Sequence, residues 1–231
     1  MKKKLVVLTG AGISAESGIS TFRDSDGLWN NYKVEDVATP EGLERNPKLV
    51  LDFYNNMRAD LPNHKPNNAH LALARLQQQF DVCVITQNVD DLHERAGSNH
   101  IIHLHGELTK VRSMRNENLI TDIGYNSIKL GNLAADGAQL RPHIVFFGEQ
   151  VPEIETAIPQ VQQADIFGII GTSLVVYPAA GLLNYAQRNV PIFVIDPKQV
   201  PLPANRNIKF VQKGAGDGMV EIEQWLNENY L

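Results

Sequence analysis

Leu5-Val6-Val7-Leu8-Thr9-Gly10-Ala11-Gly12, close to the start of the chain, is the stretch that decides the fold. Four consecutive apolar residues before Thr9-Gly10 indicate a strand that is buried on both faces, as in a parallel sheet. The two glycines predict a tight turn, after which Ser14 to Ser17 could open a helix. Such a turn can cradle a pyrophosphate. Because the spacing is not G-x-G-x-x-G, a turn without a ligand explains these residues equally well.

Further apolar runs extend this pattern along the chain. The sequence predicts strands over residues 82–85, 101–104, 166–170 and 192–195, and an extended run over 144–147 whose place in a sheet is open. Helical spacing follows Asn68, Pro178 is placed to start a helix over 179–188, and a last helix carries Trp225 and Leu226. Strands that alternate with helices predict an α/β fold with a Rossmann-like, doubly wound parallel sheet.

Two polar stretches, residues 21–65 and 107–140, interrupt this alternation. The first is rich in Asn and Pro, and the second has scattered glycines without a sustained period. We expect these two insertions to form a small, helical second lobe. The Rossmann-like domain would then consist of residues 1–20, 66–106 and 141–231.

Composition narrows the class of protein. The 231 residues carry a formal charge of −5, which disfavours direct binding to the phosphates of nucleic acid. The single cysteine, Cys83, fits a reducing compartment. The first apolar run is too short for a membrane span and lacks a cleavage pattern. We therefore expect a cytoplasmic protein that binds no membrane.

Polar motifs follow the predicted strands. Phe22, Arg23 and Asp24 lie soon after the glycine turn, and an exposed triplet of this kind supplies an aromatic wall, a cation and an acid. The stretch 87–90 follows the second strand, at the edge where open α/β sheets bind ligands. Taken alone, this stretch is explained more simply as a polar turn that caps a helix.

Two histidines, His103 and His105, alternate along the third predicted strand and so point to the same face. Either imidazole could act as a base near neutral pH, and the spacing does not choose between them. His105 has the better position, at the strand end before Gly106. We expect His93 and His143 to be structural.

Five motifs in one order resemble the sirtuins, the NAD-dependent protein deacylases. These are Gly10 to Ile19 with Phe22-Arg23-Asp24, Thr86-Gln87-Asn88-Val89-Asp90, His105-Gly106, Phe147-Gly148-Glu149 and Gly171-Thr172-Ser173. The stretch 34–40, Val-Glu-Asp-Val-Ala-Thr-Pro, further resembles the bacterial class III branch, which is grouped with mitochondrial desuccinylases.

The resemblance implies a reaction and a set of site residues. The reaction would transfer an acyl group from lysine in a protein or peptide to ADP-ribose, releasing nicotinamide and O-acyl-ADP-ribose, with His105 as general base and with Asn88 and Asp90 in the nicotinamide pocket. The implied NAD contacts are Gly10, Ala11, Gly12, Ser14, Phe22, Arg23, Asp24, Gln87, Asn88, Asp90, Gly171, Thr172, Ser173, Asp196 and Ala215. The implied substrate contacts are Tyr54, Met57, Val145, Phe147, Gly148, Glu149 and Val176. The acid at Asp196 favours NAD over NADP.

The chain departs from the sirtuin pattern at the zinc module. Most members hold zinc with four cysteines, but Cys83 is the only cysteine here, and Ser113 stands where the first of the four is expected. We therefore predict a degenerate zinc-module lobe without metal. Packing is expected to replace the metal through the side chains of Leu119, Ile120, Ile123, Tyr125, Ile128 and Leu130.

A second departure concerns the acyl group. Class III members bind an acyl carboxylate with a tyrosine and an arginine three residues later, whereas here Tyr54 is followed at that spacing by Met57 and then Arg58. One residue turns a helix by about 100°, so Arg58 does not simply replace the missing arginine, although its long stem could reach back. We expect a preference for acetyl or longer neutral acyl groups and doubtful desuccinylase activity.

Two other functions fit the same pocket. The chain could be a protein ADP-ribosyltransferase or NAD hydrolase, or a sensor of NAD without catalysis. The sensor is disfavoured because His105, Asn88 and Asp90 are all present, and a sensor would not need the base. The sequence leaves the protein substrate, the oligomeric state and any competition from ADP-ribosyl transfer open.

Overall fold

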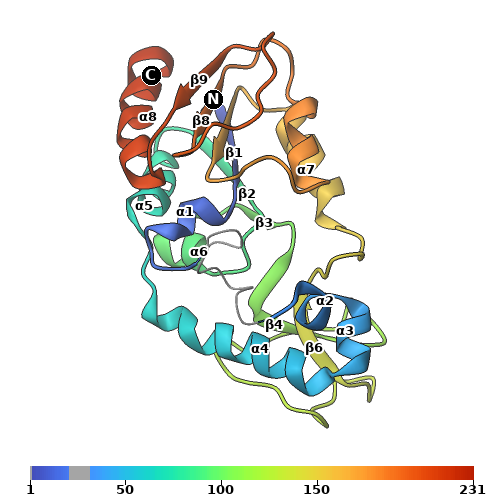
Figure 1. Ribbon diagram of the computed structural model, residues 1–231. Helices are drawn as coiled ribbons and strands as arrows, with labels where there is room; N and C mark the ends of the chain where they lie inside the picture. Colours follow the sequence, from blue (N-terminus) through green and yellow to red (C-terminus); the bar gives the residue numbers. More distant parts are fainter. Residues whose placement is uncertain (1, 21–31) are drawn as a thin grey trace.

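The computed structural model describes residues 2–20 and 32–231 and contains a six-stranded parallel sheet (Figure 1). The strand order is β3-β2-β1-β7-β8-β9. The strands are β1 Lys4–Thr9, β2 Asp81–Thr86, β3 Ile101–His103, β7 Ile166–Ile170, β8 Ile192–Ile195 and β9 Ile208–Val211. Adjacent strands are all parallel, so their carboxyl ends meet at one rim.

Helices cover both faces of this sheet (Figure 1). They are α1 Ala11–Ala15, α5 Asn68–Leu76, α6 Leu92–Ala96, α7 Glu153–Gln162, the 3-10 helix η3 Ala179–Tyr185 and α8 Ala215–Tyr230. Alternation along β1 explains the two layers, because successive strand residues face opposite sides. Leu5 and Val7 pack in the core under α5 and α8, whereas Val6 and Leu8 pack in the core under α7 and η3.

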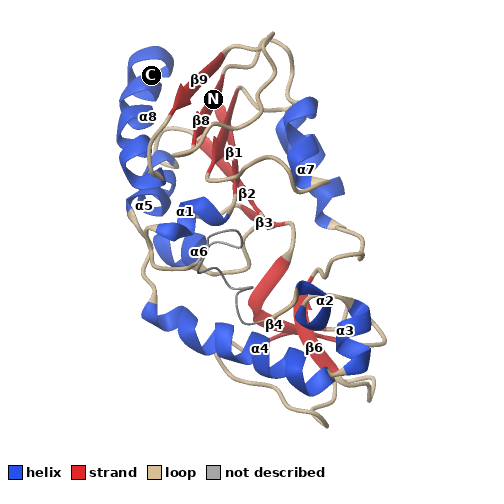
Figure 2. Ribbon diagram, in the orientation of Figure 1, coloured by secondary structure: helices blue, strands red, loops and turns tan. Residues whose placement is uncertain are grey.

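A smaller unit, which we call the small lobe, has its own sheet (Figure 2). We define it as helices α2 Val34–Val37, α3 Pro40–Arg45 and α4 Pro47–Asp60 with the antiparallel strands β4 Gly106–Ser113, β5 Ile120–Asp122 and β6 Leu140–Ile144. A short 3-10 helix, η2 Leu61–Asn63, follows α4. Apolar side chains of α4 pack with those of β4 and β6, including Val50, Phe53 and Leu108.

Side-chain caps fix where several helices begin. Thr39 accepts a hydrogen bond from the backbone of Gly42 at the start of α3, and Asn46 accepts one from Leu49 at the start of α4. Both helices carry proline in the first turn, where its missing N–H costs nothing. Asn67 caps α5 in the same way and accepts a hydrogen bond from the backbone of Ala69.

The predicted α/β fold with a parallel sheet is confirmed, and some details are corrected. Residues 107–140 carry β5 and most of β4 and contain no helix, so the regular structure of this insertion is sheet where a helical lobe was expected. The helix predicted over 179–188 is a 3-10 helix that ends at Tyr185. The residue limits of the two units remain a prediction, and β6 runs across the expected limit at residue 140.

The structure also contains α7 and β9, which the sequence pattern did not predict. Within residues 2–20 and 32–231, no helix combines the length and the apolar character that crossing a membrane requires.

Candidate active site

Two glycine loops meet at the rim of the parallel sheet. The backbone N–H of Gly12 donates to the carbonyl of Gly171 over 2.9 Å. A Cβ atom on Gly10 would lie 2.7 Å from Cβ of Thr172, and one on Gly12 would lie 2.6 Å from Cα of Gly171. Contact between the two loops therefore excludes side chains at Gly10 and Gly12. This requirement gives these glycines a packing role in addition to the predicted contact with the cofactor.

A buried polar network lies beside these loops. The Asn88 amide donates to the Ser14 hydroxyl over 3.0 Å and to the Gly10 carbonyl over 3.2 Å. Ser14 in turn donates to the Asp90 carboxylate over 3.0 Å. All three side chains are buried, and burial raises the pKa of Asp90. The structure thus brings together three of the predicted site residues from two separate segments.

This network forms part of the wall of a cavity of ≈ 120 Å³. The cavity is lined by Ala11, Ser14, Gly18, Ile19, Ser20, Met57, Asp60, Leu61, His64, Asn88, Val89, Asp90 and Leu108. Asp60 and His64 are site residues that the sequence analysis missed. They lie in the polar stretch 21–65, where no motif drew attention to them.

The hydrogen bonds of His103 and His105 distinguish these two histidines, which their spacing in the sequence did not do. The Nδ1 atom of His105 lies 3.0 Å from the carbonyl of Gln87, and Nε2 has no hydrogen-bond partner among the described residues. His103 instead uses both nitrogens, with Nδ1 3.1 Å from the Asn88 carbonyl and Nε2 2.7 Å from Glu94. His105 therefore keeps one nitrogen available for chemistry, and His103 does not.

Burial and charge act differently on these two imidazoles. Burial lowers the pKa of His105, so its neutral form prevails at neutral pH and Nε2 can accept a proton. Burial also acts to lower the pKa of His103, but the hydrogen bond and the charge of Glu94 outweigh it and raise the pKa above the ordinary value.

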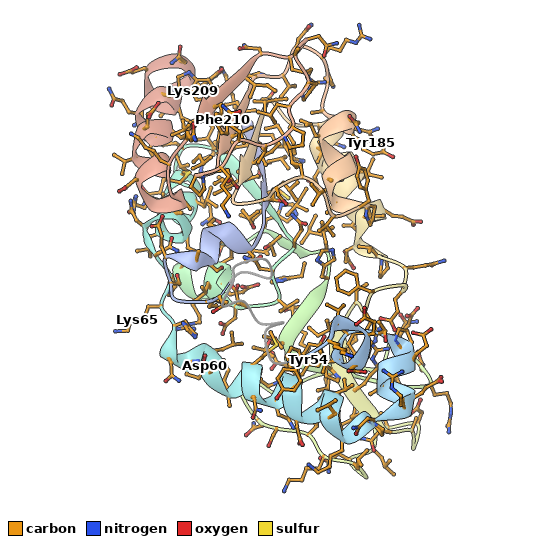
Figure 3. The ribbon with its side chains drawn as sticks, in the orientation of Figure 1. Tyr54, Asp60, Lys65, Tyr185, Lys209 and Phe210 are labelled. Carbon is orange, nitrogen blue, oxygen red and sulfur yellow. The ribbon has the colours of Figure 1, made fainter. Side chains whose placement is uncertain are left out.

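Tyr54 and Met57 both lie on α4, and Figure 3 shows Tyr54 on this helix with Asp60 farther along it. The Tyr54 ring is buried and stacks on Phe146 with 5.7 Å between centroids, and burial raises its pKa. Met57 lines the cavity. Arg58 is buried and donates to the Leu108 carbonyl and to the Asn55 side chain. Its long stem therefore does not bring its charge into the cavity.

The remaining predicted substrate contacts lie along one edge of the small lobe and in the 171–178 loop. The Phe147 ring is exposed, Gly148 has a φ of 91°, and Val145 donates from its backbone to the His105 carbonyl over 3.0 Å. Val176 is half-buried beside the exposed side chain of Val175.

The Glu149 carboxylate forms hydrogen bonds with other residues of the chain. It accepts hydrogen bonds from Arg112 over 3.2 Å, from Arg141 over 2.5 Å and from the Phe146 backbone over 2.8 Å. These bonds lower the pKa of Glu149 against the opposing effect of burial. The side chain has a structural role here, and its contact with a substrate stays a prediction.

Two further predicted NAD contacts, Asp196 and Ala215, lie directly after β8 and at the start of α8. Asp196 is half-buried, accepts a hydrogen bond from the Lys198 backbone over 2.8 Å, and has a pKa that burial raises. Ala215 is buried. Gln87 donates to the Thr172 hydroxyl over 3.0 Å, which joins the second and fifth motifs next to Ser173. The predicted contacts Phe22, Arg23 and Asp24 lie outside the described residues.

The residues that replace the zinc module do not fit a zinc ion held by thiolates. Cys83, the only cysteine, is buried in β2. Ser113 instead donates to the Asp136 carboxylate over 2.7 Å and accepts hydrogen bonds from the backbone of Arg115 and Asn116. The prediction that six apolar side chains pack here is wrong for three of them. Of the six, Ile128 is buried and Leu119 and Ile123 are half-buried, whereas Ile120, Tyr125 and Leu130 are exposed.

A parallel sheet whose rim carries glycine loops and a cavity walled in part by buried polar side chains is typical of dinucleotide-binding α/β proteins. Within that class, the profile of the Sir2 family matches residues 10–178. The chain belongs to the Sir2 family, which confirms the resemblance to sirtuins.

Relatives and solved structures agree with this assignment. The chain is 59% identical over 229 residues to an NAD-dependent protein deacylase of Bacteroides thetaiotaomicron, covering 97% of this chain and 98% of the relative. It is 51% identical over 220 residues to one of Helicobacter pylori, covering 95% and 96%. A Sir2 homologue in complex with NAD matches with a TM-score of 0.86 and 41% identity, covering 98% of this chain and 90% of that one. A Sir2 protein with a deacetylated p53 peptide and 3′-O-acetyl ADP-ribose matches with a TM-score of 0.82 and 28% identity, covering 99% and 94%.

Proposed function

We propose that this chain, an NAD-dependent protein deacylase, removes acetyl and other neutral acyl groups from lysines and acts poorly on succinyl-lysine. The observation that carries the proposal is the lining of the cavity on the α4 side. Met57 and Asp60 line it, whereas Arg58 does not, and two nitrogens of the Arg58 guanidinium donate to the Leu108 carbonyl and the Asn55 side chain. An acyl group with its own carboxylate would therefore find no arginine partner there.

The cavity fits the carboxamide end of NAD. Ser14, Asn88 and Asp90 offer hydroxyl, amide and carboxylate groups at one wall, and a carboxamide needs both donors and acceptors. NAD supplies the reactive bond between its ribose and nicotinamide. The chain supplies the walls that orient that end of the molecule and exclude water from it.

His105 is the proposed general base. Its Nδ1–H donates to the Gln87 carbonyl, which fixes the ring and leaves the lone pair of Nε2 to accept a proton from a ribose hydroxyl. The imidazolium so formed keeps its hydrogen bond to Gln87. Because burial lowers the pKa of His105, the base is ready at neutral pH.

Electrostatics at Asp60 also disfavour an anionic acyl group. Hydrogen bonds from Asn63 and His64 lower the pKa of Asp60, which is therefore ionised at neutral pH. His64 can offset this charge, but its Nε2 already bonds to Asp60 over 2.8 Å. A succinyl carboxylate would compete with Asp60 for that one partner, whereas Met57 offers polarisable apolar surface to a neutral chain.

A panel of acyl peptides tests the proposal. Purified enzyme is assayed with NAD and matched acetyl-, butyryl- and succinyl-lysine peptides, alongside Met57→Arg and the control Met57→Leu. We expect higher kcat/KM for the neutral groups, a gain of about tenfold or more on succinyl peptide in Met57→Arg, and no such gain in Met57→Leu. Faster cleavage of succinyl than of neutral peptides by the unmodified chain, with no gain in Met57→Arg, would refute the preference.

We further propose that the enzyme is a class III-like member whose small lobe needs no zinc. Support comes from the hydrogen bonds of Ser113 and Asp136 and from the lack of cysteines other than Cys83. The same single cysteine supports a reducing compartment such as the cytoplasm.

A further inference from the structure

We propose that His103 is a positioning residue: its imidazolium ties the backbone of Asn88 in the nicotinamide pocket to Glu94 on α6. This inference rests on the proposed function, because that function gives the 87–91 loop its ligand. His103 has no free ring nitrogen to offer a substrate, so it would act through the loop that it holds.

The two hydrogen bonds of His103 require its ring to be charged. We call His103 with its two partners, the Asn88 carbonyl and the Glu94 carboxylate, the clamp. Nδ1 of His103 lies 3.1 Å from the Asn88 carbonyl oxygen, and Nε2 lies 2.7 Å from Oε1 of Glu94. A carbonyl and an ionised carboxylate only accept hydrogen bonds, so both ring nitrogens must donate. A neutral imidazole has one N–H and an imidazolium has two. Only the cation can make both bonds.

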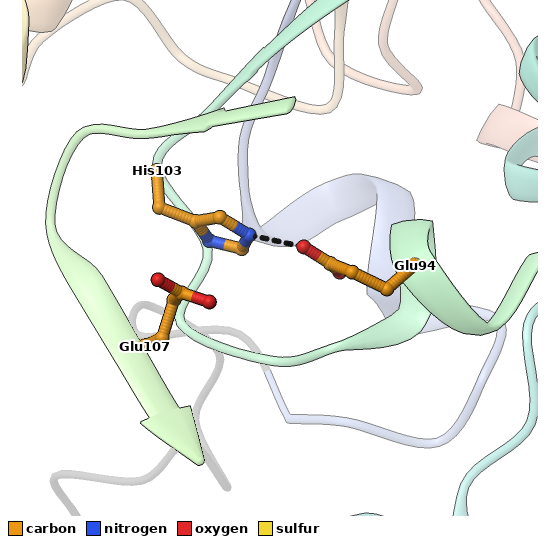
Figure 4. Close-up of side chains that lie close together, drawn as sticks. All are labelled: Glu94, His103 and Glu107. Carbon is orange, nitrogen blue, oxygen red and sulfur yellow. Dashed lines mark hydrogen bonds and ion pairs between the residues drawn. The ribbon is translucent and has the colours of Figure 1, made fainter. Parts of the chain in front are cut away.

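The charged surroundings of His103 favour that cation. Figure 4 shows the ring with Glu94 on one side and Glu107 of β4 on another, and ligand atoms of the three residues all lie within 4.8 Å of one another. Nζ of Lys110 on β4 lies 2.7 Å from the Glu107 carboxylate and partly offsets its negative charge. The other ionisable groups that act on the ring are His93 on α6 and Asp90 in the loop. Three carboxylates thus outnumber the single ammonium group.

The clamp acts on a loop that is held at two successive carbonyls. His105 bonds to the carbonyl of Gln87 and His103 to that of Asn88. The Asn88 side chain then reaches Ser14 and Gly10 across the cavity wall. When His103 loses its proton, one of its two bonds must break. The loop is then less constrained at the residue that contacts the nicotinamide end of NAD.

Three variants separate this role from packing. In His103→Asn, the side-chain amide can still donate to the Asn88 carbonyl and does not titrate. His103→Phe keeps a planar ring but has no donor. Glu94→Gln leaves His103 in place and removes the carboxylate that stabilises its cation, so the loss of the proton should move to lower pH.

The test measures binding of NAD and of ADP-ribose by calorimetry from pH 6 to about pH 9.5, with EDTA present so that no divalent cation competes for the Glu94, His103 and Glu107 atoms. ADP-ribose is the matched control because it lacks nicotinamide. We expect NAD affinity of the unmodified chain to fall by about tenfold at alkaline pH while ADP-ribose affinity changes little. In His103→Phe we expect the same loss of NAD affinity at every pH. In His103→Asn we expect no loss at alkaline pH, and in Glu94→Gln we expect the loss to begin at lower pH.

The proposal is overturned if His103→Asn binds NAD as weakly as His103→Phe, if the alkaline loss persists in both, or if ADP-ribose affinity falls in parallel. If both His103 variants unfold, Glu94→Gln decides by itself. The proposal is then wrong if NAD affinity of Glu94→Gln falls at the same alkaline pH as that of the unmodified chain. Failure of the proposed function would look different: the unmodified chain would bind NAD but form no acyl-ADP-ribose from an acyl-lysine peptide.

Discussion

The two sheets of this molecule are held together in different ways. The central strands of the parallel sheet are mainly apolar, and β7, with the sequence Ile-Phe-Gly-Ile-Ile, is fully buried. The antiparallel sheet of the small lobe carries the buried cations Arg112 and Arg141, which share the carboxylate of Glu149. Its outer strand β5 is exposed. Apolar burial therefore dominates one sheet, and polar contacts between distant residues contribute to the other.

This difference decides how the site is built. The rigid rim of the parallel sheet presents Ser14, Asn88, Asp90 and the glycine loops, whereas the small lobe supplies the α4 side chains that face the same cavity. Cofactor chemistry would then depend on the parallel sheet, and acyl choice on the lobe. Substitutions in the two sheets should consequently have separable effects.

The largest loss of stability is expected in the parallel sheet from Phe193→Ala. Phe193 is fully buried in β8, packs edge-on to Trp225 and lies directly over Gly168. Removal of its ring should lower the free energy of unfolding by about 3–5 kcal/mol. Urea denaturation measures this, with the exposed Val220→Ala on α8 as control. Equal effects of the two substitutions would contradict an apolar core at this position.

Glu149→Ala should give the next largest effect, and it should be centred on the small lobe. The substitution leaves Arg112 and Arg141 buried without their shared carboxylate, at a cost of about 3 kcal/mol. Hydrogen exchange followed by mass spectrometry should show faster exchange in β4 and β6 than in β1 and β7. Glu228→Ala, at an exposed position of α8, is the control. Uniform destabilisation of both sheets would mean that they do not differ in this way.

Ser113→Ala should have a smaller effect confined to the part of the small lobe around Ser113. Ser113 is buried and bonds to Asp136 and to two backbone N–H groups. The expected loss in free energy of unfolding is about 1 kcal/mol. The exposed Ser127→Ala is a matched control. If the two serine substitutions are indistinguishable in thermal unfolding, these hydrogen bonds do not stabilise the lobe.

Chelation should have no effect, which makes it the smallest of these perturbations. Dialysis against EDTA should leave the Tm unchanged if, as we propose, the small lobe needs no zinc and the hydrogen bond between Ser113 and Asp136 helps to hold it together. Metal analysis of the same sample provides the control. A lower Tm after removal of stoichiometric zinc would show that the lobe depends on a metal after all.

Local patterns in the sequence predicted five of the six strands of the parallel sheet but not the strands of the small lobe. Four-residue apolar runs such as Val82 to Ile85 are sufficient to mark a buried strand, because burial on both faces leaves no alternation. The strands of the small lobe pair residues far apart in the chain, such as Ser113 with Leu140. Their side chains are mixed in polarity, so no period marked them.

The candidate site was predictable to a similar extent. The position of Asn88 and Asp90 after a strand was visible from the sequence, and so was the strand-end position of His105. The direction of Arg58 was not, because it is set by the Leu108 carbonyl, which is 50 residues away. The partner of His103 was not predictable either, since Glu94 lies on a different element. Choosing between the two histidines required these three-dimensional contacts.

Product analysis by mass spectrometry tests the central claim most directly. Purified chain and His105→Ala are incubated with NAD and an acetyl-lysine peptide. The unmodified chain should convert these into nicotinamide, O-acetyl-ADP-ribose and free lysine peptide, and His105→Ala should be slower by at least about a hundredfold while it still binds NAD. Release of nicotinamide without peptide, ADP-ribose attached to protein as the main product, or full turnover by His105→Ala would contradict the account.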